Sequence, residues 1–320
     1  MTQQNTIIVK SRSNAIRLDQ FVIDSAHPVA SLTRKEIQTR IESGKILLNE
    51  QQVRPSRMVK PGDLVTILEI KKENLERASL PTGISVLFEN ESFLALEKPA
   101  GLSMHPAREG QNGTLAHWIL AKYPKIAHVG DDPLRPGIVH RLDKETSGLV
   151  LVAKNEAAFL ALKNLFAQRQ VEKGYMALVY GEPKEASGTI TLPLGRVAGG
   201  VRRGTPVKKR AFSGQLREAI TEYTLHTAYP QFSLLSIKPK TGRTHQIRVH
   251  LSAIGHPVVG DRLYAFKKHK KGLFPEHQLL HAEKIQFTLF GQTYDFHSPL
   301  PNRFRQFLKL CKIPNGLPSA

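Results

Sequence analysis

The chain has 320 residues, of which 40% are hydrophobic, and its formal net charge is +19 at pH 7. These values exclude an intrinsically disordered chain and allow two domains with separate cores. The positive excess, with a sequence pI of about 10.0, indicates a polyanionic partner. Nucleic acid is favoured over an anionic membrane surface and over charge that only promotes solubility.

Cysteine content and hydropathy further narrow the possible classes of protein. Cys311 is the single cysteine, which excludes an internal disulfide framework and a cysteine-ligated zinc site. It falls at helical spacing with Phe304 and Phe307, so we expect it in a core. The first residues lack the charged start and apolar run of a signal peptide, and no apolar stretch reaches the ~18–20 residues of a membrane span. We therefore expect a cytoplasmic protein with no membrane contact.

Residues 1–70 form the first predicted domain, a small α/β unit. A short amphipathic helix around Leu18 to Val22 precedes a second helix, whose start is marked by a capping box at Thr33 and Glu36. Two strands follow, at Ile46 to Leu48 and Leu64 to Ile70. Basic residues crowd this unit, namely Arg34, Lys35, Arg40, Lys45, Arg54, Arg57 and Lys60.

The order of these elements resembles the alpha-L RNA-binding module first seen in a small-subunit ribosomal protein, the S-four type. The resemblance implies that Arg34, Lys35 and Arg57 contact RNA phosphates, which gives sequence-tolerant affinity that weakens with salt. A solvated basic face is the alternative interpretation. Residues 71–83 are charged and end in Pro-Thr-Gly, so they are predicted to be a linker.

Residues 84–312 form the second predicted domain, and residues 313–320 a tail. Apolar patterns predict a number of strands and three helices, at Thr114 to Tyr123, after Asn155, and at Asn302 to Cys311. Strands outnumber helices and few connections have the pattern of a helical crossover. This favours an α+β fold with a mixed, mainly antiparallel sheet. Basic insertions at 202–210 and 267–271 lack an apolar period and are expected to be exposed loops that grip a polyanion.

The stretch from Gly137 to Val152 contains the candidate reacting group. Ile138-Val139 is predicted to end one buried strand, and Leu149 to Val152 to begin another. Asp143 lies in the polar turn between them, with Arg141 close by. A turn held between two core strands is rigidly placed, as a reacting group requires.

A second polar cluster runs from Lys238 to His250 and holds an excess of hydrogen-bond donors. Thr244 is predicted to cap a helix that carries Ile247 and Arg248. An arginine here needs a phosphate or an acidic partner, and Asp143 is a natural one because a paired carboxylate tolerates burial. Residue types alone leave open whether such a pair is structural or catalytic. The histidine spacings match no metal-ligand pattern, so no metal is expected.

Several stretches resemble the signature segments of the RluA/RluD-type pseudouridine synthases. The longest are HRLDKETSGLVLVAKN at 140–155, KGYMALVYG at 173–181 and KTGRTHQIRVHLSAIGHPVVGDRLY at 240–264. Shorter ones are EKPAGL at 97–102, MHP at 104–106 and AITEY at 219–223. HRLD followed by TSG, with GRTHQIR downstream, is a specific combination, whereas each piece alone is weak. The matches span 84–300, and many members acting on ribosomal RNA carry the S-four-type module in front.

The resemblance implies roles for individual residues. Asp143 is in the position of the essential aspartate, and Arg248 in that of its arginine partner. Tyr175 is in the position of the tyrosine that stacks on the flipped base, and Ile247 in that of a pocket-lining residue. Arg141 is in the position of the arginine that enters the RNA stack. His140 and Arg243 are further expected RNA contacts.

The implied reaction breaks the N1–C1′ bond of uridine, turns the ring and joins C5 to C1′. Because this is an isomerisation, no redox cofactor, nucleotide or metal is expected. Asp143 could add to C1′ as a nucleophile or assist removal of a sugar proton to give a glycal, and the residues leave both routes open. Extruding the uridine costs a few kcal/mol, which stacking worth ~1–3 kcal/mol per base offsets.

The expected substrate is ribosomal RNA, specifically that of the large subunit, because of the front module and the positive charge. One alternative is the same chemistry on transfer RNA. Another is a non-catalytic RNA-binding or ribosome-assembly protein with the same fold. Asp143, Tyr175 and Arg248 together argue against the second alternative.

Overall fold

The computed structural model describes residues 3–8, 16–25, 34–69, 80–106, 113–199, 202–207, 211–270 and 274–311. By internal contacts the chain divides into two compact units, residues 1–78 and 79–320. Three predicted features fall outside the described residues: the tail at 313–320, the linker residues 71–79, and the capping box at Thr33 and Glu36.

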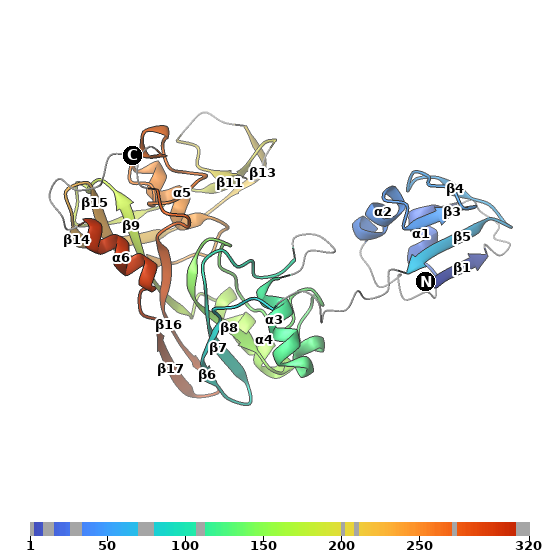
Figure 1. Ribbon diagram of the computed structural model, residues 1–320, viewed down its shortest axis with the longest axis horizontal. Coiled ribbons are helices and arrows are strands. Elements are labelled where there is room, and N and C mark those ends of the chain that lie inside the picture. Colours follow the sequence, from blue (N-terminus) through green and yellow to red (C-terminus); the bar gives the residue numbers. More distant parts are fainter. Residues whose placement is uncertain are drawn as a thin grey trace. The chain divides into compact units, whose positions relative to one another are not determined.

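The first unit is a small sheet with two helices (Figure 1). Its three strands run in the order β1 (Gln3–Ile8), β5 (Leu64–Glu69), β3 (Ile46–Leu48), all antiparallel. The helices are α1 (Leu18–Ile23) and α2 (Arg34–Glu42), and β2 (Ile16–Arg17) pairs with β4 (Met58–Val59). Leu18 and Val22 of α1 share one core with Ile37 and Ile41 of α2. The predicted helices and strands of this unit are therefore present.

The second unit is built on a nine-stranded sheet, ordered β10-β14-β15-β9-β16-β8-β7-β6, with β17 paired to β16. Every pairing is antiparallel except that of β16 with β8. The strands are β6 (Ser85–Glu89), β7 (Phe93–Lys98), β8 (Ser147–Ala153), β9 (Glu172–Tyr180), β10 (Ser187–Ile190), β14 (Thr221–Ala228), β15 (Phe232–Pro239), β16 (Leu280–Leu289) and β17 (Gln292–His297). A smaller sheet holds β11 (Leu194–Val197), β12 (Arg203–Gly204) and β13 (Phe212–Arg217).

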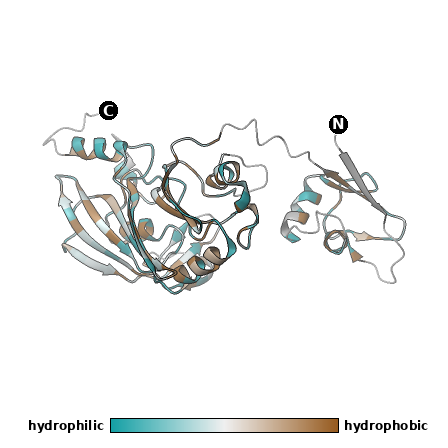
Figure 2. Ribbon diagram, turned by 90° about the horizontal axis from the view of Figure 1, so that it is seen from below, coloured by the Kyte–Doolittle hydropathy of each residue, from teal (hydrophilic) through white to brown (hydrophobic). Residues whose placement is uncertain are grey.

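Helices cover both faces of this sheet (Figure 1). They are α3 (Leu115–Lys122), α4 (Glu156–Ala167), α5 (Gln246–Ala253) and α6 (Asn302–Cys311). Figure 2 shows hydrophobic residues along the strands, and both hydrophilic and hydrophobic residues on α6. The α+β class with a mixed, mainly antiparallel sheet is confirmed. Cys311 lies buried in a core with Phe304 and Phe307, as its spacing predicts.

Strand β9 shows how the sheet separates the two layers. Met176 and Leu178 pack in one core with residues of α6, whereas Ala177 and Val179 pack in another with Ile247 of α5. The alternation follows from the two-residue period of a strand. The odd-numbered side chains of β9 therefore face α5.

Three local predictions are wrong. Ile138 and Val139 do not form a strand, since only an isolated bridge joins Ile138 to Val152. The residue before α5 is His245 rather than Thr244. The basic insertions are not entirely loops, because Arg203–Gly204 pairs with β11 and Lys267–Lys270 forms a short 3-10 helix. Arg203–Gly204 and Lys267–Lys270 are shaped by neighbours close in the chain, whereas His245 contacts Tyr264, 19 residues further along.

Candidate active site

Asp143 lies in the turn immediately before β8. The backbone N–H of Thr146 closes the turn by donating to the carbonyl of Asp143 at 3.1 Å. The Asp143 side chain is 16% exposed, so it is mostly buried and still reachable from solvent. Its Oδ2 accepts from Arg248, while Oδ1 lies 3.9 Å from His245 Nε2. The turn thus presents one carboxylate oxygen that is not used by the arginine.

Arg248 on α5 is held between two carboxylates. Its Nη1 donates to Asp143 Oδ2 at 2.8 Å, and its Nε and Nη2 donate to the two oxygens of Asp261 at 2.7 and 2.9 Å. The guanidinium also lies over the ring of Tyr264, with 5.0 Å to the centroid. Burial opposes the charge of Arg248, but Asp261 and Asp143 outweigh it and raise the pKa of the guanidinium. The planar fork matches this bidentate geometry, which a lysine could not reproduce.

Asp261 connects this arginine to the backbone. The side chain is fully buried, and its Oδ1 accepts from the backbone N–H groups of Leu263 and Tyr264 at 2.9 and 3.1 Å. The same carboxylate therefore holds the turn that follows Val258 and also binds Arg248. A buried charge is tolerated when it is paired and hydrogen-bonded in this way.

His245 begins α5 in the left-handed conformation, with φ 59°. Its Nδ1 lies 2.7 Å from the hydroxyl of Tyr264, and burial lowers the pKa of the imidazole. Gln246 fastens the preceding loop: its Oε1 accepts from Thr241 Oγ1 and the Arg243 N–H, and its Nε2 donates to the Ile220 carbonyl. Gln246 thus joins the loop at 241–243 to the backbone of Ile220, just before β14.

Lys98, at the end of β7, is hydrogen-bonded to the turn that contains Asp143. The side chain is fully buried, and Nζ donates to the carbonyls of Pro99, Leu102 and Lys144 at 2.9, 2.9 and 3.2 Å. Burial lowers the pKa of this ammonium to about 7, against the charges of Asp143 and Glu145. The lysine joins the β7 end to the residue after Asp143.

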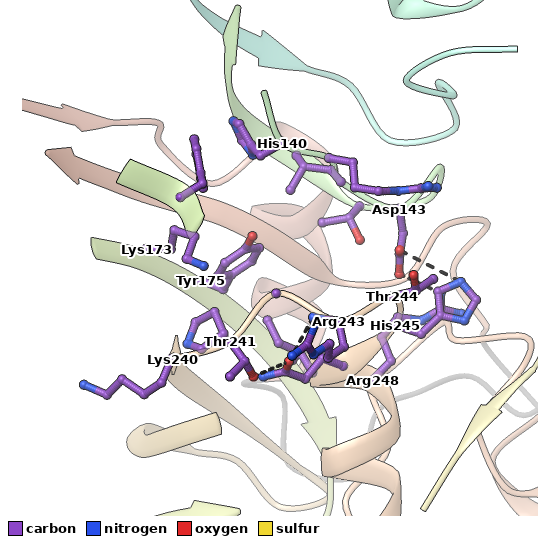
Figure 3. A pocket seen from close by; sticks show the side chains of 18 of the residues that line it. His140, Asp143, Lys173, Tyr175, Lys240, Thr241, Arg243, Thr244, His245 and Arg248 are labelled. Carbon is purple, nitrogen blue, oxygen red and sulfur yellow. Dashed lines mark hydrogen bonds and ion pairs between the residues drawn. The ribbon is translucent and has the colours of Figure 1, made fainter. Parts of the chain in front are cut away.

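A cavity of about 420 Å³ opens at this point, within the range of small-molecule sites. Figure 3 shows Asp143 and Arg248 on one side of it and Tyr175 with Lys173 on the other. All seven site residues predicted in the second unit line this cavity: Arg141, His140, Asp143, Tyr175, Arg243, Ile247 and Arg248. They come from the turn before β8, from β9, and from α5 with the loop before it.

Tyr175 and His140 are held differently. Burial and the charge of Asp143 raise the pKa of Tyr175, so its phenol is neutral at physiological pH. Burial lowers the pKa of His140 to about 3, and its Nε2 accepts the backbone N–H of Leu151 at 2.8 Å. The His140 ring also stacks on Phe166, with centroids 4.5 Å apart. His140 therefore has a structural task besides lining the cavity.

The predicted cations of the second unit lie nearer to solvent. Arg141 is exposed. Arg243 donates from Nε to the carbonyl of Glu218 at 3.2 Å. Both line the cavity.

The first unit holds the remaining predicted contacts. Arg34 pairs with the buried Asp19 at 3.2 Å while its side chain stays 51% exposed, and Arg57 is exposed beside a hollow that Arg17 and Arg54 also line. Burial disfavours the charge of Asp19, but hydrogen bonds from Arg17, Gln38 and Arg34 lower its pKa overall. The side chain of Lys35 lies outside the described residues.

Comparison with known proteins gives this site its context. Residues 92–253 match the model of the RNA pseudouridylate synthase family, and residues 16–65 match the S4 domain. A Chlorobaculum parvum protein named an uncharacterized RNA pseudouridine synthase is 36% identical over 312 residues, covering 92% of this chain and 94% of its own length. The chain belongs to the RNA pseudouridylate synthase family. It is an RNA pseudouridine synthase, an isomerase, with an S4 domain in front.

Further relatives of this synthase carry more specific names. A Zymomonas mobilis protein named ribosomal large subunit pseudouridine synthase D is 32% identical, covering 93% of this chain and 95% of its own length. Among solved structures, human RNA pseudouridylate synthase domain containing 1 has a TM-score of 0.55 and 28% identity, covering 68% of this chain and 83% of that one. The second unit is thus similar in fold to a solved protein that contains an RNA pseudouridylate synthase domain.

Within the part of the synthase that the structure describes, no group of three or more histidine, cysteine, aspartate or glutamate side chains has the arrangement of a metal site. None of its helices combines the length and the apolar character needed to span a bilayer.

Sequence reasoning missed several residues of the site, namely Lys98, Lys173, Asp261 and Tyr264. Asp261 could have been found, because it lies in the segment 240–264. An arginine has more N–H donors than one carboxylate can accept, so Arg248 calls for a second acidic partner besides Asp143. Lys173 stands two residues before Tyr175 on a predicted strand, which puts both side chains on one face.

Proposed function

We propose that this synthase converts specific uridines of large-subunit ribosomal RNA to pseudouridine, with Asp143 as the essential group. The observation that carries the proposal is the paired Asp143 carboxylate at a nucleoside-sized cavity opposite Tyr175. The names of the relatives from Zymomonas mobilis and Neisseria meningitidis support the ribosomal target. The S4 domain and the net charge of +19 support binding to a structured RNA. A cytoplasmic location would accord with such a substrate.

The proposed cycle begins when a uridine leaves the RNA stack and enters the cavity. Arg141, at the exposed rim, takes the vacated place in the stack, and Tyr175 stacks on the base. The ring then lies between Tyr175 and the Asp143 turn. Ile247, 7% exposed, gives the base an apolar contact.

The chemistry needs one ionised carboxylate near C1′. When the N1–C1′ bond breaks, its electron pair goes to N1. Asp143 Oδ1 either forms an ester bond to C1′ or helps remove the 2′ proton to give a glycal. After the ring turns, C5 bonds to C1′. In the ester route the Asp143–C1′ bond breaks at this step, and in the glycal route the C1′–C2′ double bond is lost as the 2′ proton returns. The C5 proton then leaves. Arg248 holds Oδ2, so Oδ1, which the arginine does not engage, is the oxygen that acts on the sugar.

Substitution of Asp143 by asparagine tests this proposal. It removes the charge and keeps the size, so RNA binding should persist while pseudouridine formation is abolished. The measurement is chemical mapping of pseudouridines in ribosomal RNA from cells that lack the gene and carry each variant, because an isomer has no mass signature. Asp295→Asn, which alters an exposed ion pair with Lys284, is the matched control and should retain activity. Normal modification by Asp143→Asn would overturn the role of Asp143, and modification found only in transfer RNA would overturn the ribosomal target.

A further inference from the structure

Lys173 on β9 is a partly buried cation that has no partner within the described residues. No hydrogen bond or ion pair of its ammonium is formed there, and its side chain lines the cavity. Burial lowers the pKa of Lys173, and no carboxylate opposes that effect. An ammonium that is partly withdrawn from water and has no anionic partner loses solvation without compensation, so its presence in the cavity calls for a function.

Lys173 and Tyr175 lie on the same face of β9, the face directed toward α5. Figure 3 shows the two side chains next to each other on one wall of the cavity, across from Asp143. Residues two apart on a strand are separated by roughly 7 Å. A base stacked on Tyr175 would therefore present an edge to the ammonium of Lys173.

Three of the other cations that line the cavity have acidic partners. Arg248 is shared by Asp143 and Asp261, Lys240 pairs with Glu222 at 2.9 Å, and Arg169 pairs with Glu218 at 3.7 Å. Arg141 is exposed, and Arg243 donates to the backbone carbonyl of Glu218. Lys173 is thus a partly buried cation of the cavity to which the described residues supply neither a carboxylate nor a hydrogen-bond acceptor.

We propose that Lys173 stabilises the uracil anion that forms when the N1–C1′ bond of the bound uridine breaks. The inference rests on the proposed function of this cavity. The electron pair of the broken bond stays with the base as a monoanion, whose charge is spread over N1, O2, O4 and C5. The ammonium beside the ring edge lowers the energy of this charge by a hydrogen bond to a ring oxygen. After C5 bonds to C1′, the C5 proton leaves and N1 takes up a proton, so the base is neutral again.

Leaving-group chemistry tests this role. Lys173→Met should lower the single-turnover rate on uridine RNA by about 10²-fold or more, the effect of removing one oxyanion-hole donor. RNA affinity should change by less than about threefold, and Lys173→Arg should recover part of the rate. On RNA with 5-fluorouridine at the target, fluorine itself stabilises the anion. The loss in N1–C1′ cleavage, measured by nuclease digestion and chromatography, should then be at least about tenfold smaller.

Lys238→Met is the matched control. Lys238 lies on the adjacent strand β15, and its ammonium pairs with Glu172 at 3.2 Å outside the cavity. This variant should turn over both RNAs like the wild type. If Lys173→Met does not fold, Lys173→Gln replaces it with the same expectations, since glutamine is polar and neutral.

Two results would overturn the inference: a neutral variant within about threefold of the wild-type rate, or an equal loss on uridine and 5-fluorouridine RNA. The second would mean that Lys173 acts only on the shape of the cavity. Failure of the proposed function looks different, because the wild type would then form no pseudouridine or Asp143→Asn would remain active. Neither of those results involves Lys173.

Discussion

The pair between Asp261 and Arg248 predicts a large and specific loss of stability when it is broken. Asp261→Asn keeps an oxygen that can accept from the Leu263 and Tyr264 N–H groups but removes the charge facing Arg248. Breaking a buried pair by removing one partner costs about 3–5 kcal/mol. Because Arg248 still pairs with Asp143, we expect the lower end, about 3 kcal/mol. At roughly 2–4 °C per kcal/mol for a domain of this size, Tm should fall by roughly 6–12 °C.

A double-mutant cycle separates the pair from general damage. Arg248→Met alone leaves Asp261 buried without its partner, whereas the double variant removes both charges. The double variant should therefore be more stable than the sum of the single losses predicts, with a coupling energy of about 2 kcal/mol or more. Urea unfolding is followed by the fluorescence of Trp118, the single tryptophan, which is 8% exposed on α3 and reports on the second unit.

The exposed pair of Lys284 with Asp295, at 3.2 Å, supplies the control cycle. Solvent screens this pair, so its coupling should be only about 0.2–1 kcal/mol. If Asp261 and Arg248 show additive losses, with coupling below about 0.5 kcal/mol, the buried fork does not act as a unit. The account of how Arg248 is held at Asp143 would then be refuted.

Three further changes have defined outcomes. In the folded protein the pKa of Lys98 is lowered to about 7, from an ordinary 10.5. Between these two pH values the unfolded chain binds more protons than the folded protein does. The free energy of unfolding should therefore rise with pH by up to about 1.4 kcal/mol per pH unit. Lys98→Met should lack this contribution in pH-dependent urea unfolding, and parallel curves for the two proteins would contradict it. Asn155 caps α4 by accepting from the Ala158 N–H at 2.9 Å, so Asn155→Ala should cost about 1 kcal/mol in the same assay, and no loss would contradict the cap. Lys268→Ala should weaken RNA binding mainly at low salt, whereas Arg248→Ala should lower single-turnover activity at every salt concentration; equal losses at all concentrations would contradict this division.

Local patterns in the sequence determined the secondary structure and the kind of partner. Helix α6 begins and ends at the predicted Asn302 and Cys311, and the Asn155 cap lies where its position before an apolar stripe predicts. Periodicity and caps act over one or two turns, so a single sequence records them. The family resemblance carried by HRLD and GRTHQIR further indicated which residues belong to the site.

Only the tertiary structure decided how those residues meet. Asp143 and Arg248 are 105 positions apart along the chain, and the second carboxylate on Arg248 comes from Asp261, which the sequence did not single out. The left-handed His245 and the fully buried Lys98 contradict local preference, because their hydrogen bonds reach distant backbone and side-chain groups. Such contacts depend on which strands pair and which helix covers them, and local propensity does not encode that. The position of Lys173 inside the cavity, without a hydrogen-bond or ion-pair partner among the described residues, likewise emerges only from the tertiary structure.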